Sequence, residues 1–182
     1  MKHIVLTLLL AVISFSAKAE IYKVVIPDER CGKMCFYWWP VLPDIDGWQQ
    51  DMPNSYHYSA NAQAPEGESF SNAESVIYAK ALYKPRIPNT KTLVQLIEED
   101  KNDFKQNSNS VITKLESLAT SDGMALTSYQ FFPRDKGNYE RVSYGEEGEF
   151  YLVFTLSSRS EESYQSTMPV YKQFIEQYSE MP

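Results

Sequence analysis

Three tryptophans, Trp38, Trp39 and Trp48, lie within eleven consecutive positions and are the only tryptophans of the chain. Neighbouring residues of a strand point to opposite faces of a sheet, so Trp38 or Trp39 should face outward unless another element covers it. Asp44 and Asp46 lie in the same stretch, and aromatic rings beside carboxylates suit the stacking of sugars or cations. We expect these five residues to form an interaction surface. The other interpretation is that the rings only fill the core.

The two cysteines of the chain, Cys31 and Cys35, enclose a short segment that begins with Gly32. In an oxidising compartment this spacing favours a small disulfide loop. Redox catalysis fits less well, because thioredoxin-like motifs place two residues between the cysteines rather than three. A third interpretation is a Cu(I) site formed by both cysteines and Met34, since soft sulfur ligands select this ion.

Residues with the chemistry for catalysis are few. Beyond the first nineteen residues the chain has one histidine, His57, so any nucleophile and histidine pair would require it. The acidic run at residues 98–100 should point around a helix as a solvated face, and Asp44, Asp46 and Asp51 lack the terminal glutamate of a calcium-binding loop. The sequence therefore predicts no catalytic residue, no metal ligand, no cofactor and no enzyme. An acid-dependent hydrolase, for example one acting on glycans, is the alternative, because the separation of two carboxylates is a three-dimensional quantity.

The first nineteen residues have the pattern of an export signal rather than of a folded element. Residues 4–15 are apolar except for Thr7 and Ser14, and Ala17 and Ala19 give the small-residue pattern that signal peptidase cleaves. The apolar run is too short to span a bilayer. We therefore expect a cleaved signal peptide at residues 1–19 and one globular domain at residues 20–182, located in the periplasm or secreted.

The charge of the chain limits its partners. Removing Lys2 and Lys18 with the signal peptide takes the formal net charge from −7 to −9. An acidic surface repels phosphate backbones and anionic lipid heads, so we do not expect nucleic acid binding. No later segment approaches 18 consecutive apolar residues, so we expect no membrane insertion after cleavage. The expected partner is a protein or a small ligand.

Hydrophobic periodicity predicts the main elements of the domain. Residues 75–83 alternate as a strand with apolar residues on both faces, and Thr92 begins a helix with a capping box that includes Gln95. Residues 160–178 predict a closing helix, in which Pro169 lies either in the first turn or inside a longer helix. Four further segments alternate with period two and are separated by hairpin-like turns: 111–118, 124–132, 139–144 and 149–156. We expect these four to form an antiparallel meander, with 149–156 near the centre of the sheet.

Turn-forming residues dominate the part of the chain before residue 75. Residues 36–61 are rich in Pro, Asp, Asn and aromatic residues, which favour turns and short edge strands over a helix. The polar composition of residues 62–72 predicts a loop. No regular element is therefore expected between residue 62 and the strand at 75–83.

In the order of its elements the chain resembles the Mog1/PsbP family. The likeness rests on Gly47 and Trp48 after the Pro-rich strand and on the pairing of residues 149–156 with the helix at 168–175. The resemblance implies an α+β fold in which helices cover both faces of an antiparallel sheet, an α/β/α sandwich. Family members act mostly as binding partners or adaptors and share no catalytic centre, which implies an interaction module here.

Overall fold

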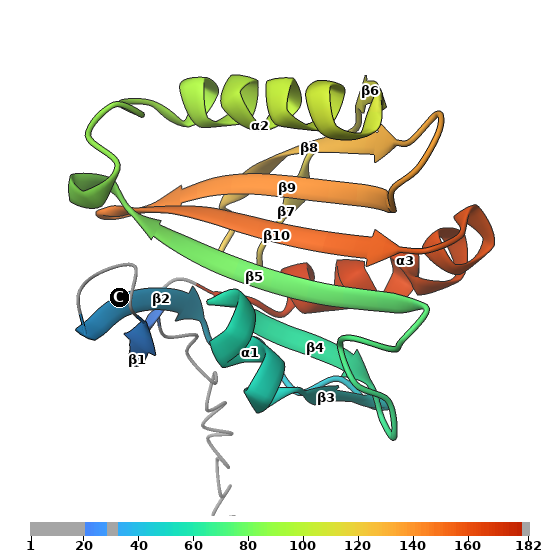
Figure 1. Cartoon of the computed structure of the whole chain (residues 1–182), viewed down its shortest axis with the longest axis horizontal. Helices are drawn as coiled ribbons and strands as arrows, with labels where there is room; N and C mark the ends of the chain where they lie inside the picture. The colour runs from blue at the N-terminus through green and yellow to red at the C-terminus, as the bar shows by residue number, and fades with distance from the viewer. Residues whose placement is uncertain (1–20, 29–32, 180–182) are drawn as a thin grey trace, which may run out of the picture.

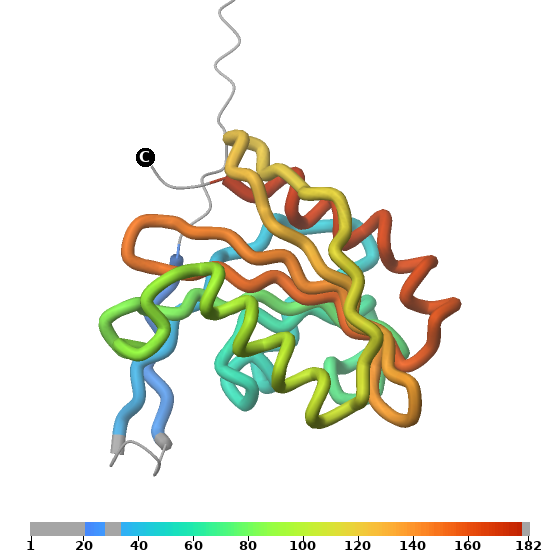
Figure 2. The backbone as a smooth tube through the Cα atoms, turned by 90° about the horizontal axis from the view of Figure 1, so that it is seen from above, coloured from blue at the N-terminus to red at the C-terminus, as the bar shows by residue number. Residues whose placement is uncertain are grey.

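The fold is an α/β/α sandwich built on one large antiparallel sheet, as the sequence predicts (Figure 1). The computed structural model describes residues 21–28 and 33–179. The eight-stranded sheet has the order β3-β4-β5-β10-β9-β8-β6, with β7 paired to β8, and a separate hairpin consists of β1 and β2. Figure 2 shows α2 and α3 on opposite sides of the sheet.

The elements follow one another along the chain with these bounds: β1 (Ile21–Asp28), β2 (Lys33–Pro40), β3 (Trp48–Gln50), α1 (Met52–Tyr58), β4 (Asn61–Pro65), β5 (Ser75–Tyr83), α2 (Leu93–Ser108), β6 (Val111–Lys114), β7 (Leu118–Ala119), β8 (Ala125–Phe132), β9 (Tyr139–Glu147), β10 (Phe150–Ser158) and α3 (Glu161–Glu176). A short 3-10 helix (Lys84–Arg86) follows β5.

Strand β10 lies at the centre of the large sheet, as predicted. Its nine residues pair with β9 on one side and with β5 on the other, over the whole length of all three strands. Leu152, Phe154 and Leu156 face α3 and pack with its buried residues Tyr171 and Phe174. The alternate residues face α2, so β10 is buried on both faces. This double burial explains why its sequence is apolar almost without interruption.

Helix α2 covers the other face over β8 and β9. The hydroxyl of Thr92 accepts a hydrogen bond from the backbone N–H of Gln95 at 3.1 Å, which confirms the predicted cap. Gln95 in turn accepts from the N–H of Lys91 rather than from that of Thr92. The rings of Phe104 and Phe131 stack with their centres 4.1 Å apart. This stacking holds α2 against β8.

Two elements contradict the expectations for the first half of the domain. Helix α1 lies inside the stretch expected to contain only turns and edge strands, and Pro53 occupies its first turn, where a missing N–H costs no helical bond. Strand β4 lies at the start of the expected polar loop. Its residues Asn61 and Gln63 are buried because their amide groups hydrogen bond within the fold.

From β5 onward the elements agree with the prediction apart from their boundaries. Strand β9 runs on to Glu147, so the connection to β10 is the two-residue turn of Gly148 and Glu149. The segment expected at 111–118 divides into β6 and β7. Of the two interpretations of Pro169, the longer helix is the one observed.

Candidate functional site

A solvent-open hollow with aromatic walls lies where the hairpin, α1 and the edge strand β3 meet. We call it the aromatic hollow. It has a volume of about 250 Å³, and its aromatic walls are Tyr22, Trp39, Trp48 and Tyr56. Val41 and Met52 extend the apolar lining, and Asp44 adds a carboxylate. The hollow thus combines four aromatic rings with polar lining residues, which are Asp44, Gln49, Gln50, Asn61 and Gln63.

Packing and hydrogen bonds hold these walls in place. Trp39 is 2% exposed, and its ring meets that of Tyr56 edge to face with centres 6.0 Å apart. Trp48 makes a similar contact with Phe174 of α3 at 6.1 Å. The side-chain amide of Asn61 donates to the carbonyl of Pro40 at 2.9 Å and joins the end of β2 to the start of β4. The hollow is therefore preformed.

Asp51 positions α1 against the sheet. Its carboxylate caps the helix by accepting from the N–H of Asn54 at 3.1 Å, and it accepts a second backbone bond from Phe70 at 2.8 Å. Burial acts to raise the pKa of Asp51, but these bonds outweigh it and hold the pKa below its ordinary value. This carboxylate serves the structure of the site rather than a calcium ion.

The structure brings together three of the five predicted surface residues. Trp39, Asp44 and Trp48 line the aromatic hollow. Trp38 points to the other side of β2, where it packs on Tyr83 with ring centres 5.0 Å apart. Asp46 is exposed and is not among the residues that line the hollow.

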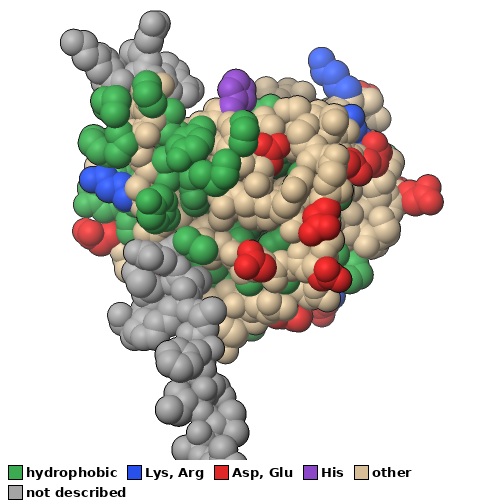
Figure 3. All heavy atoms as spheres, turned by 90° about the horizontal axis from the view of Figure 1, so that it is seen from below, with side chains coloured by type: hydrophobic (Ala, Val, Ile, Leu, Met, Phe, Trp, Pro, Cys, Tyr) green, Lys and Arg blue, Asp and Glu red, His purple; other side chains and the backbone are tan. Residues whose placement is uncertain are grey.

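The rim of the aromatic hollow consists of exposed apolar side chains. Tyr22 is 55% exposed, and Tyr56, Val41 and Met52 are each exposed by more than 40%. Figure 3 shows the molecule from below. Hydrophobic side chains gather in the upper left of this view, and most carboxylates lie in its right half. The tryptophans indicated the region, but the exposed residues at its rim belong to the hairpin, the segment after β2, and α1.

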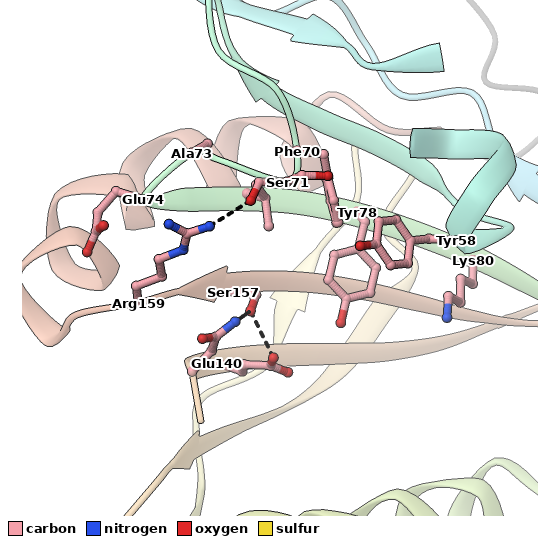
Figure 4. Close-up of a pocket in the computed structure, with 12 residues that line it drawn as sticks. Tyr58, Phe70, Ser71, Ala73, Glu74, Tyr78, Lys80, Glu140, Ser157 and Arg159 are labelled. Carbon is pink, nitrogen blue, oxygen red and sulfur yellow. Dashed lines mark hydrogen bonds between the residues drawn. The ribbon is translucent and has the colours of Figure 1, made fainter. Parts of the chain in front are cut away.

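A second hollow contains ionisable groups that sequence patterns did not single out. We call it the sheet hollow; its volume is about 330 Å³, and it lies over β5, β10 and β9 (Figure 4). Lys80 and Glu140 line it together with Tyr58, Phe70 and Tyr78. The sequence pattern predicted only that Lys80 and Tyr78 share one face of a covered strand. No pattern marked Glu140 as a candidate functional residue.

Burial shifts the pKa values of Lys80 and Glu140, which line the sheet hollow, and of the nearby Asp100. Desolvation raises the pKa of Glu140 from 4.5 to about 7, against the hydrogen bond from Ser157, and the charge of Asp100 adds to the rise. Desolvation also raises the pKa of Asp100, although the hydroxyl of Tyr144 donates to this carboxylate at 3.0 Å. The pKa of Lys80 is lowered because desolvation outweighs the attraction of both carboxylates. Asp100 therefore turns toward the sheet, and the expectation of a solvated acidic run at residues 98–100 is wrong at this position.

The geometry on which a carboxylate hydrolase depends is only partly present. Glu74 and Glu140 both line the sheet hollow, but Glu74 is exposed whereas Glu140 is half-buried. Such an enzyme needs two carboxyl groups on either side of the bond that is cleaved. His57 is an exposed residue of α1. Within residues 21–28 and 33–179, no three side chains of His, Cys, Asp or Glu are grouped to hold a metal ion.

Two predictions involve residues outside the described part of the chain. The signal peptide at 1–19 is one. The other is the disulfide, because Cys31 is not described, although Cys35 is 5% exposed in β2. Both stay predictions. None of the helices in the described segments is long and apolar enough to span a membrane.

Comparison with known proteins gives one likeness of fold to report. No protein-family model matches the chain, and no curated protein matches it. Among solved structures the chain is similar to the solution structure of cyanobacterial PsbP (CyanoP) from Synechocystis sp. PCC 6803, with 14% sequence identity and a TM-score of 0.41. The match covers 90% of this chain and 92% of that chain. It concerns a PsbP protein, in keeping with the resemblance in element order, and we derive no function from it.

Proposed function

We propose that this protein is an exported, non-catalytic interaction module that binds a partner protein through the aromatic hollow. The observation that carries the proposal is an open, preformed hollow with two tryptophans in its walls and a rim of exposed apolar side chains. Contiguous exposed apolar residues are costly in water and mark interaction surfaces.

The dimensions of the hollow favour a polypeptide over a free small molecule. Its volume of about 250 Å³ is below the usual range of roughly 300–1,000 Å³ for small-molecule pockets. A volume of this kind suits one apolar side chain of a partner, inserted as an anchor between aromatic walls. Asp44 lines the same hollow, and the chain is acidic overall, so the partner should carry a basic residue beside this anchor.

The proposal is tested by capture of partners from the native envelope, followed by affinity measurements on the partner identified. Tyr56→Ala removes an exposed wall residue and should weaken binding by tenfold or more, as expected for a hot spot of about 2 kcal/mol. Val94→Ala is the matched control, because Val94 is 69% exposed but lies on α2, away from the hollow. Equal affinity of both variants and the wild type would contradict the proposal.

Export is tested separately by mass spectrometry of the N-terminus in the native host. A mature protein that begins at or near Glu20 is the expected result. Recovery of the intact chain from the cytoplasm would contradict it.

A further inference from the structure

The sheet hollow presents two opposite charges that do not pair with each other. Lys80 and Glu140 both line it, and each shifts the pKa of the other. Among the described residues, the ion pairs within 4 Å join Lys84 to Glu146 and Lys101 to Glu98, so Lys80 and Glu140 are farther apart than this limit.

Strand register explains the separation. Lys80 on β5 pairs with Val153 of β10, and Glu140 on β9 pairs with Ser157 on the other side of β10. Val153 and Ser157 are four residues apart, which is about 13 Å at roughly 3.3 Å per residue. The two side chains therefore enter the hollow from opposite ends and from opposite sides of β10. Tyr78 lies between them, because it pairs with Thr155, midway between Val153 and Ser157.

Each charged group retains capacity for a further partner. The ammonium of Lys80 makes no hydrogen bond or ion pair with the described residues and lies 5.8 Å from the centre of the Tyr78 ring. One carboxyl oxygen of Glu140 accepts from the hydroxyl of Ser157 at 2.8 Å, and that hydroxyl accepts from the side-chain amide of Asn138 at 2.9 Å. A desolvated ammonium without a partner is costly in free energy. An anionic group bound at this end of the hollow would therefore stabilise the complex.

Aromatic rings form the wall between the two groups. The rings of Tyr58 and Phe70 have centres 5.1 Å apart, and those of Phe70 and Tyr78 have centres 5.8 Å apart. Figure 4 shows Phe70 at the top, Glu140 with Ser157 at the lower left and Lys80 at the right, with the ring of Tyr78 between them. Such a wall suits the methylene chain of a ligand and attracts an ammonium group.

We propose that the sheet hollow binds a small zwitterion of the amino-acid class, whose carboxylate pairs with Lys80 and whose primary ammonium pairs with Glu140. The negative end of the ligand meets the positive group of the hollow and its positive end meets the negative group, so Lys80 and Glu140 each gain an oppositely charged partner. A volume of about 330 Å³ lies within the range of small-molecule pockets. This site is separate from the aromatic hollow, and the two proposals stand independently.

The ammonium end of the ligand requires an ionised Glu140. With a pKa of about 7 in the free protein, Glu140 loses its charge as the pH falls, and the affinity should decrease below that pH. The charged and titratable groups around it are Lys80 and Tyr78 from β5, Asp100 and Asp103 from α2, Lys136 from the β8–β9 turn, Glu74 before β5 and Arg159 after β10.

The experiment is a titration of the purified protein with 4-aminobutanoate and with glycine as long and short zwitterions, followed by calorimetry and by amide chemical shifts. Butylamine and butanoate, each with one of the two charges, are the controls. We expect one zwitterion to bind at least tenfold more tightly than either control and to shift the amides of Thr155 and Ser157 in β10. Lys80→Met and Glu140→Gln should each lower this affinity at least tenfold, whereas Tyr56→Ala should not change it.

Three outcomes would overturn this proposal. The first is that neither zwitterion shifts these β10 amides, and the second is that butylamine or butanoate binds as tightly as the zwitterions. The third is unchanged affinity in Lys80→Met and Glu140→Gln variants whose cooperative unfolding shows that they fold. Because Lys80→Met leaves the aromatic hollow intact, capture of the partner protein by this variant separates a failure of this proposal from a failure of the first.

Discussion

Replacing Glu140 with Gln tests directly how strongly the sheet hollow shields this half-buried carboxylate from water. The pKa of Glu140 is about 7 in the folded protein, against 4.5 for an ordinary glutamate. The folded state therefore binds more protons than the unfolded state between these values, and the free energy of unfolding falls as the pH rises through this window. The penalty is absent below the window and complete above it.

The size of the effect follows from this difference. Each pKa unit corresponds to about 1.4 kcal/mol, so a shift from 4.5 to about 7 gives a penalty of about 3 kcal/mol. The side-chain amide introduced by Glu140→Gln keeps a carbonyl oxygen that accepts from the Ser157 hydroxyl, so the substitution removes the charge and retains the hydrogen bond. Glu140→Gln should therefore stabilise the protein by about 3 kcal/mol at about pH 8.5 and by less than about 0.5 kcal/mol at about pH 4.5.

The assay is urea unfolding of wild type and variant across this pH range, followed by tryptophan fluorescence. Glu149→Gln, in the exposed β9–β10 turn, is the control and should not change the pH dependence. The reasoning is refuted if the stability difference between Glu140→Gln and wild type is the same at both ends of the range.

Three further predictions concern a wall of the aromatic hollow, the hydrogen bond from Tyr144 to Asp100, and the cysteines. Trp39→Ala should lower the free energy of unfolding by about 4 kcal/mol in urea titrations, because it leaves a large cavity at a residue 2% exposed. Tyr144→Phe should cost about 2 kcal/mol at neutral pH, since a carboxylate of α2 loses its hydroxyl donor; an unchanged unfolding midpoint would contradict this. Alkylation of the exported protein without reductant should label neither Cys31 nor Cys35, and two labelled thiols would instead favour the Cu(I) interpretation.

The parts of the fold that the sequence predicts are those where one local pattern decides the structure. The strand at 75–83 and the cap at Thr92 are examples, because alternation and a capping hydroxyl act over a few neighbouring residues. The sequence did not predict helix α1 because seven residues are too few to show a helical period. Asp51 as the cap and Pro53 in the first turn are nevertheless a favourable helix start. Strand β4 was missed because its amides look like those of a loop until their buried partners are known.

The candidate sites could be predicted only in part for the same reason. The clustering of Trp39 and Trp48 pointed to the aromatic hollow, but Tyr22 and Tyr56 reach it from other elements and carry no signal of their own. Lys80 and Glu140 are sixty positions apart in the sequence and line the same hollow because of the register of β5, β10 and β9. Such a register depends on long-range pairing, which no local pattern contains.

The hairpin of β1 and β2 should behave as a separate cooperative unit in hydrogen exchange. Among the described residues its strands pair only with each other, whereas β10 pairs on both sides along its full length. Side chains such as Arg86, which donates to the carbonyl of Phe36, join the hairpin to the rest of the fold. Its amides should therefore exchange through a local opening that costs less free energy than the global unfolding needed to expose β10. Since Tyr22 and Trp39 belong to this hairpin, each such opening removes one wall of the aromatic hollow, and a bound partner should slow the exchange of β1 and β2 while leaving that of β10 unchanged.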